Sequence, residues 1–161
     1  MNPKEYNKCV DEYADNLYRF ILKNIKDKDK AKDIVQDTFE KLWLKSPELH
    51  FSKARPWMFT TAYRAMIDLL RREQKQGKFE DVDFSSLSYE KNYSDLQEIL
   101  HHALNKLPSD QKAVVLLRDY EGYSYEEISG ITGLSEAQVK VYIFRARTFL
   151  KKYIGSIDAI V

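Results

Sequence analysis

Residues 124–152 read SYEEISGITGLSEAQVKVYIFRARTFLKK, and this stretch decides the fold of the C-terminal half of the chain. Two capping boxes, each a serine followed three residues later by an acid or an amide, begin at Ser124 and Ser135. Gly133 lies between them and suits the left-handed backbone conformation that ends a helix. The pattern predicts a short helix, a tight turn and a second helix over 135–152, which together form a helix-turn-helix.

The second of these helices has an unusual outward face. Plotted at about 100° per residue, its apolar side chains gather on one side. The opposite side presents Lys140, Val141, Phe144, Arg145, Arg147, Lys151 and Lys152. A basic helix face is commonly no more than a solvated surface, but solvent gives no reason for an outward Phe144, whereas a base edge or a thymine methyl group does. These residues favour DNA recognition by the 135–152 helix.

A second face of this kind comes from residues 52–75, SKARPWMFTTAYRAMIDLLRREQK. Helical spacing directs an apolar stripe toward the core and leaves Trp57, Thr61, Arg64, Asp68, Arg71 and Lys75 on the other side. An aromatic ring among arginines suits stacking on unpaired bases while the cations hold phosphates. The alternative is that Trp57 packs against a neighbouring helix and that the arginines either extend their charged ends into solvent or pair with acids. Spacing leaves both interpretations open.

The periodicity along the rest of the chain predicts an all-α protein of two small helical domains. Helical patterns fill 6–74 and 94–154, and the polar stretch between them, 75–93, is expected to be a flexible linker. In the first domain, the helix over 30–44 leaves Asp33, Gln36, Asp37, Glu40 and Lys41 outward. Such a polar stripe is either a solvated surface or a docking face for another protein, and spacing does not decide between them.

The composition of the 161-residue chain argues against several classes of function. The single cysteine, Cys9, excludes an intramolecular disulfide framework, and the three histidines form no zinc or catalytic pattern, so we expect neither a cofactor nor an enzyme activity. With no apolar run long enough for a membrane span and no signal peptide, the expected compartment is the cytoplasm. The net charge of +1 hides a segregation, because 95–133 carry seven acids and three bases whereas 134–161 carry five bases and two acids.

Longer stretches of the sequence resemble a known family. DKAKDIVQDTFEKLW (29–43) and RPWMFTTAYRAMIDLLRR (55–72) resemble region two of bacterial RNA polymerase sigma factors, in the extracytoplasmic-function (ECF) subfamily of the sigma-70 family. LPSDQKAVVLLRDYEGYSYEEISGITGLSEAQVKVYIFRARTFLKK (107–152) resembles their region four. The two regions stand in the family's order across a linker of suitable length. Arg64 and the pair Val141-Tyr142 depart from the residues common in the family.

The resemblance implies a dissociable, non-catalytic subunit that gives core RNA polymerase its promoter specificity. Its partners would be the β′ and β subunits of polymerase, promoter DNA and an anti-sigma factor, with no small-molecule substrate. Region two would bind polymerase through Asp33, Gln36, Asp37 and Trp43. It would read and hold open the minus-ten element through Phe51, Lys53, Arg55, Trp57, Arg64 and Arg71. Region four would read the minus-thirty-five element through Ser135, Gln138, Lys140, Val141, Phe144, Arg145 and Arg147.

Other classes of protein fit parts of the pattern. A stand-alone helix-turn-helix regulator would use 6–74 as a sensor or dimerisation domain and would bind promoters without polymerase. A protein-interaction module, such as a decoy that occupies polymerase or an anti-sigma protein, would tolerate charge reversal at Lys140 and Arg145. An enzyme is the weakest alternative, because the histidines and Cys9 have no paired partners in the sequence.

Overall fold

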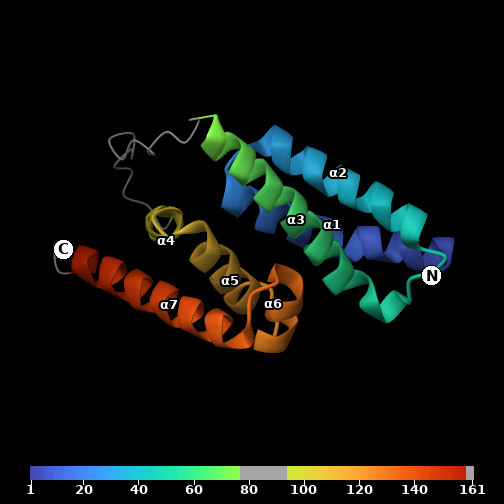
Figure 1. The fold of residues 1–161 in the computed structure, drawn as a ribbon. Coiled ribbons are helices and arrows are strands. Elements are labelled where there is room, and N and C mark those ends of the chain that lie inside the picture. The colour runs from blue at the N-terminus through green and yellow to red at the C-terminus, as the bar shows by residue number, and fades with distance from the viewer. Residues whose placement is uncertain (77–93, 159–161) are drawn as a thin grey trace.

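The computed structural model describes residues 1–76 and 94–158, and within these ranges every regular element is a helix (Figure 1). The N-terminal half contains α1 (Pro3–Ile25), α2 (Lys28–Lys45), the 3₁₀-helix η1 (Phe51–Lys53) and α3 (Ala54–Lys75). The C-terminal half contains α4 (Ser94–Asn105), α5 (Ser109–Asp119), α6 (Tyr125–Thr132) and α7 (Glu136–Asp158). The predicted all-α class is confirmed. Residues 77–93 of the predicted linker lie outside the described residues.

Side-chain caps explain where the first two helices begin. The Asn2 side chain accepts a hydrogen bond from the Glu5 amide (2.8 Å), and the Glu5 carboxylate accepts one from the Asn2 amide (3.0 Å). Asp27 caps α2 by accepting from the amides of Asp29 and Lys30, both at 3.1 Å. These bonds satisfy amides that have no partner inside the helix, and the charged run at 26–30 contains the boundary between α1 and α2.

Each half buries the apolar stripe that its periodicity predicts. In the N-terminal half, where α1, α2 and α3 lie side by side, the fully buried residues include Leu17, Ile21, Leu42, Met58 and Met66. In the C-terminal half, the five consecutive residues 113–117 of α5 are all buried, and α7 contributes Val139, Ile143 and Ala146. None of the helices within 1–76 and 94–158 is both long and apolar enough to span a membrane.

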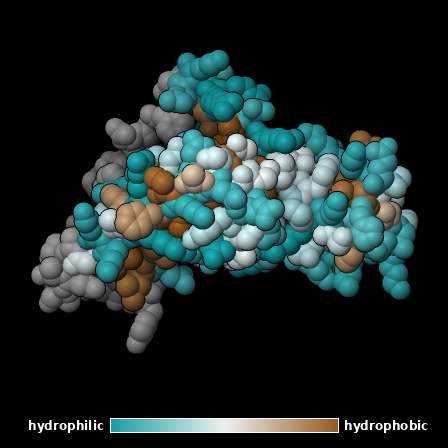
Figure 2. Space-filling model, turned by 60° about the horizontal axis from the view of Figure 1, so that its bottom comes forward, coloured by the Kyte–Doolittle hydropathy of each residue, from teal (hydrophilic) through white to brown (hydrophobic). Residues whose placement is uncertain are grey.

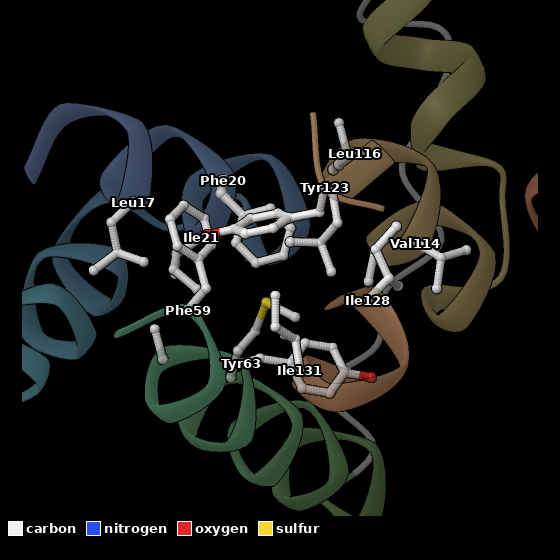
Figure 3. Close-up of a cluster of buried hydrophobic side chains, with 14 of the residues drawn as sticks. Leu17, Phe20, Ile21, Phe59, Tyr63, Val114, Leu116, Tyr123, Ile128 and Ile131 are labelled. Atoms are coloured by element: carbon white, nitrogen blue, oxygen red, sulfur yellow. The ribbon is translucent and has the colours of Figure 1, made fainter. Parts of the chain in front are cut away.

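The two halves pack against each other, and their buried side chains form one continuous core. Figure 3 shows Leu17, Phe20 and Ile21 of α1 and Phe59 and Tyr63 of α3 facing Leu116 of α5, Tyr123, and Ile128 and Ile131 of α6. The Phe59 ring centre lies 5.4 Å from that of Tyr123 and 5.6 Å from that of Phe20. The sequence did not predict this contact. Separate domains over 6–74 and 94–154 remain a prediction.

Candidate nucleic-acid interface

The predicted helix-turn-helix is present in α6 and α7. Ser124 caps α6: its hydroxyl accepts from the Glu127 amide (3.1 Å), and the Glu127 carboxylate accepts from the Ser124 amide (2.9 Å). Gly133 ends α6 at a φ of 79°, the left-handed conformation predicted for it. Ser135 and Gln138 repeat the reciprocal pair at the start of α7, at 3.1 and 3.0 Å. Both capping boxes are confirmed, so Ser135 and Gln138 hold the turn whatever else they bind.

The outward face of α7 carries cations and apolar side chains together, as predicted. Phe144 is 70% exposed and Val141 is 43% exposed, and Lys140 and Arg145 lie on the surface beside them. Figure 2 turns the lower side of Figure 1, where α6 and α7 lie, toward the viewer and shows hydrophobic side chains among hydrophilic ones. An exposed phenylalanine gains hydrophobic free energy only when a partner covers it. The surface position of Phe144 is confirmed, and its contact with DNA stays a prediction.

Arg147 differs from its neighbours on this face because an acid already holds it. Its guanidinium donates two hydrogen bonds to the carboxylate of Asp119 at the end of α5, one of them from Nε at 3.2 Å. The hydrogen bond to Asp119 raises the pKa of Arg147 above its usual range, so the cation is permanent. Both side chains are nearly half exposed, and an ion pair in water stabilises the fold little. A phosphate is therefore able to replace Asp119.

The second predicted face begins at η1 and follows α3. Lys53, Arg64 and Arg71 are exposed, whereas Phe51 and Trp57 are half-buried. The Lys8 ammonium lies 5.6 Å from the centre of the Phe51 ring. Three predicted cations are thus free to meet a polyanion, while both aromatic rings lie against the protein.

Trp57 faces the helix-turn-helix of the other half. A groove of about 440 Å³ between α3 and α6 is lined by Trp57 and Arg64 on one side and by Glu127 and Ile131 on the other. The position of Trp57 agrees with the packing alternative, and the binding of nucleic acid by this face stays a prediction. The arginine points outward, and the tryptophan lies beside a neighbouring helix.

Arg55 lies between the two halves, with its side chain 33% exposed. Its guanidinium donates to the main-chain oxygen of Glu121 (2.8 Å) and lies 3.6 Å from the Glu121 carboxylate. It also lies 4.5 Å from the ring centre of Tyr123 and 5.8 Å from those of Tyr13 and Phe59. Burial raises the pKa of Glu121, and the nearby Arg55 opposes that shift. The resemblance placed Arg55 near unpaired bases, and in this arrangement such a contact competes with the contacts of Arg55 to Glu121 and Tyr123.

The residues predicted to bind polymerase line one side of α2. Asp33 and Gln36 are exposed, Asp37 is half-exposed and Trp43 is 50% exposed. The Asp37 carboxylate lies 3.0 Å from the Lys41 ammonium, and the Trp43 ring meets Tyr6 edge to face at 5.0 Å. These residues are accessible, as a docking surface requires. Their binding to polymerase stays a prediction.

A groove of about 590 Å³ joins this stripe to the basic side of α3. Asp33 and Asp37 of α2 line it together with Arg64, Asp68 and Arg72 of α3. Asp33 and Asp37, which the resemblance assigns to polymerase, therefore share one polar groove with Arg64, which it assigns to DNA.

Sequence reasoning missed Lys112, a buried lysine between the halves. It is 5% exposed, and its ammonium donates to the side-chain oxygen of Asn105 (3.0 Å) and to the main-chain oxygen of Asn24 at the end of α1 (3.4 Å). Burial lowers the pKa of Lys112 to about 7, and the nearby Lys26 adds to the shift. The available signal was its position directly before the apolar run AVVLL (113–117).

Comparison with known proteins matches both halves of the chain. The model of sigma-70 region 2 matches residues 9–76, and the model of sigma-70 region 4 matches residues 97–150. The ECF RNA polymerase sigma factor SigM of Bacillus subtilis (strain 168) is 33% identical, over 86% of this chain and 88% of its own length. The chain belongs to the ECF sigma factors. The RNA polymerase sigma factor SigV of the same organism is 31% identical, over 89% of this chain and 87% of its own length.

Solved structures agree with this family. The sigma factor RpoE of Bartonella quintana, crystallised in complex with the anti-sigma factor NepR, superposes with a TM-score of 0.77 at 27% identity, covering 94% of this chain and 98% of that one. CnrH, in complex with the cytosolic domain of CnrY, gives a TM-score of 0.72 at 23% identity and shows the shared fold. In this ECF sigma factor, region 2 contains η1 and nearly all of α1 to α3, and region 4 contains the helix-turn-helix.

Proposed function

We propose that the chain is a non-catalytic sigma subunit that directs core RNA polymerase to promoters in the cytoplasm. The observation that carries this proposal is a cationic, aromatic-bearing face on each of the two sigma regions. In region 4 it is the outward side of α7 around Phe144, and in region 2 it is the η1–α3 segment around Trp57. Two such faces in one chain suit two elements of one promoter.

The outward side of α7 is suited to reading the minus-thirty-five element in the major groove. Arg145 hydrogen-bonds a guanine edge, Phe144 and Val141 contact thymine methyl groups, and Lys140 and Arg147 hold phosphates. The phosphate contacts give an affinity that falls as salt rises, and the base contacts give the choice of sequence.

The η1–α3 segment is suited to the minus-ten element once its strands separate. Trp57 stacks on an unpaired base, while Lys53, Arg64 and Arg71 hold the phosphates of the same strand. Binding that prefers unpaired bases shifts the duplex toward the open form. This step makes and breaks no covalent bond, so the chain itself needs no catalytic group.

In this proposal the exposed side of α2 binds the polymerase. Substituting one of its acids tests that contact. Asp37→Arg puts a cation in the middle of the stripe and is expected to abolish co-purification with core polymerase without changing helical content. Asp11→Arg makes the same charge change at an exposed acid of α1 and is the matched control. If Asp37→Arg still co-purifies while its helical content is unchanged, the stripe is not the docking surface.

An anti-sigma factor is a further proposed partner. The solved relative RpoE of Bartonella quintana is bound to one, and both promoter faces proposed here offer cations that an acidic protein surface would cover.

Run-off transcription tests the proposed function directly. Purified core polymerase with this chain, incubated with a library of promoters, is expected to start transcripts at a defined set of sequences that core polymerase alone ignores. Failure to start anywhere, with polymerase that a known sigma factor activates, would contradict the proposal.

A further inference from the structure

We propose that α1 contributes a phosphate-binding side chain, Lys8, to the nucleic-acid face of region 2. Lys8 lies beside Phe51 of η1, and together with Lys53 at the end of η1 these residues form what we call the α1–η1 site. Its ligand is an unpaired nucleotide of the separated promoter strand, whose base meets Phe51 and whose phosphate meets Lys8. The inference rests on the proposed function, because it extends the path of the same strand beyond α3.

The fold brings α1 and η1 to the same end of region 2. Figure 1 shows that α1 begins near the point where α2 is followed by η1. The Lys8 ammonium lies 5.6 Å from the centre of the Phe51 ring. Phe51 is half-buried, whereas 61% of the Lys8 side chain is exposed. A ligand that reaches the ring therefore also reaches the ammonium.

Local hydrogen bonds hold both sides of the α1–η1 site in place. The capping box of Asn2 and Glu5 fixes the first turn of α1, and Lys8 follows in the next turn. On the other side, the main-chain oxygen of His50 accepts a hydrogen bond from the Lys53 amide (2.9 Å) and closes the turn of η1. Binding a nucleotide therefore orders little more than two exposed lysine side chains, which limits its entropic cost.

The contacts of Lys8 are weak enough for a phosphate to replace them. Its ammonium lies 3.9 Å from the carboxylate of Glu12, which is 45% exposed, and an ion pair this exposed contributes little. Glu5, another acid in this part of α1, accepts a hydrogen bond from the Asn2 amide. A phosphate accepts charge-assisted hydrogen bonds from the same ammonium. Lys8 is thus a cation available to a nucleic acid.

The α1–η1 site supplies both kinds of contact that single-strand binding needs. The accessible part of the Phe51 ring suits stacking on a base of any sequence, while the lysines hold the backbone. Lys53 is exposed and follows Phe51 by two residues, so it is available to a neighbouring phosphate. The site therefore adds one phosphate contact, at Lys8, to those of the η1–α3 segment.

The salt dependence of single-strand binding tests this contact. The probe is a fluorescein-labelled single-stranded DNA with the minus-ten sequence of a promoter that the wild-type chain uses in run-off transcription, and the protein is the chain assembled with core polymerase. Lys8→Met removes one phosphate contact and is expected to reduce the slope of log K against log salt by about 0.7. Binding then weakens about fivefold at about 0.1 M salt and hardly changes at about 1 M.

Two matched variants separate a phosphate contact from other effects of the substitution. Lys28→Met removes the same charge from an exposed position at the start of α2 and is expected to keep the wild-type slope. Lys8→Arg keeps the cation and is expected to keep the slope as well. A wild-type slope in Lys8→Met, an equal loss in Lys28→Met, or no rescue by Lys8→Arg overturns the inference.

A double-mutant cycle tests whether the ring and the ammonium bind the same nucleotide. Combined with Phe51→Leu, Lys8→Met is expected to weaken binding by less than the product of the two single effects, because the two side chains share a ligand. Lys28→Met and Phe51→Leu are expected to multiply. Simple multiplication in both pairs overturns the shared site. If Phe51→Leu fails to fold, as judged by circular dichroism, the salt slope of Lys8→Met decides.

Run-off transcription separates this inference from the proposed function. A wild-type chain that initiates, together with a Lys8→Met chain whose salt slope is unchanged, overturns the α1–η1 site alone. A wild-type chain that initiates nowhere overturns the proposed function, and the site with it.

Discussion

The outward side of α7 and the start of α3 carry the same kinds of side chain but differ in access. On α7, Phe144 is 70% exposed and Arg145 lies on the surface. On α3, Trp57 lies in a groove beside α6, and Arg55 is bonded to Glu121. The chemistry of a face thus follows from its own residues, whereas its accessibility depends on a contact with residues far away in the chain. In this arrangement the outward side of α7 is the more accessible of the two faces.

The largest expected difference between the two regions is in stability. Phe59→Ala removes a fully buried ring from the core that the halves share and is expected to lower the free energy of unfolding by about 3–5 kcal/mol. Phe144→Ala truncates a ring that is mostly in water and is expected to change it by less than about 0.5 kcal/mol. Chemical denaturation followed by circular dichroism measures both. Equal losses would show that the two rings do not differ in burial.

Promoter selectivity is expected to show the next largest effect. Arg145→Ala removes the cation proposed to read a base from the exposed face of α7 and is expected to weaken binding of the polymerase complex to specific promoters by about 1–3 kcal/mol. The loss should be confined to one base position of the minus-thirty-five element, because the other contacts remain. Binding to a panel of single-base promoter variants measures it. A uniform loss over the whole panel would instead assign Arg145 to phosphate.

The contact between the halves is expected to weaken as pH falls. The closed chain holds the pKa of Lys112 at about 7, below the ordinary lysine value, so it binds fewer protons than the open chain. Its stability therefore declines as pH falls from the ordinary lysine pKa toward 7, by up to about 1.4 kcal/mol per pH unit, and levels off below 7. Trp57 emission in the Trp43→Phe background measures the closed fraction.

Charged neighbours make a control for this pH dependence necessary. Lys26 faces Lys112 from the end of α1, and His101 of α4, whose pKa is lowered mainly by burial, lies near enough to feel its charge. Lys112→Met removes the titrating amine while leaving both neighbours. The slope above pH 7 is expected to disappear in that variant, and an unchanged slope would assign the titration to another group.

The smallest effect is expected at the ion pair between Arg147 and Asp119. Asp119→Asn leaves Arg147 charged but free, and because the pair is exposed, stability should fall by no more than about 0.2–1 kcal/mol. Arg147 then binds phosphate without first leaving an acid, so region 4 should bind duplex DNA slightly more tightly at low salt. Titrations at several salt concentrations measure this gain. A weaker affinity would mean that Asp119 positions Arg147 for DNA.

Local pattern was enough to predict most of the fold. The capping boxes at Ser124 and Ser135 and the left-handed Gly133 gave the helix-turn-helix correctly, because each depends on residues within four positions. The outward positions of Phe144 and Arg64 followed from helical spacing for the same reason. Such features can be predicted without knowledge of the rest of the chain.

Periodicity in the sequence does not predict which residues far apart in the chain pack together. The bond from Arg55 to Glu121 joins residues 66 positions apart, and the contact of Lys112 with Asn24 joins residues 88 apart. Nothing in either segment alone shows that it has a partner. The resemblance therefore assigned Arg55 and Trp57 to DNA, whereas spacing alone could not show that Glu121 and Tyr123 lie beside Arg55 or that α6 lies beside Trp57.

Oxidative footprinting of two side chains tests the account most directly. Hydroxyl radicals are applied to the free chain and to the chain assembled with core polymerase and a promoter, and mass spectrometry measures the oxidation of Phe144 and Tyr123. We predict opposite changes: Phe144 is oxidised in the free chain and protected in the complex, whereas Tyr123 is protected in the free chain and oxidised in the complex. If Tyr123 stays protected while Phe144 becomes covered, the halves bind the promoter without separating, and the account is wrong.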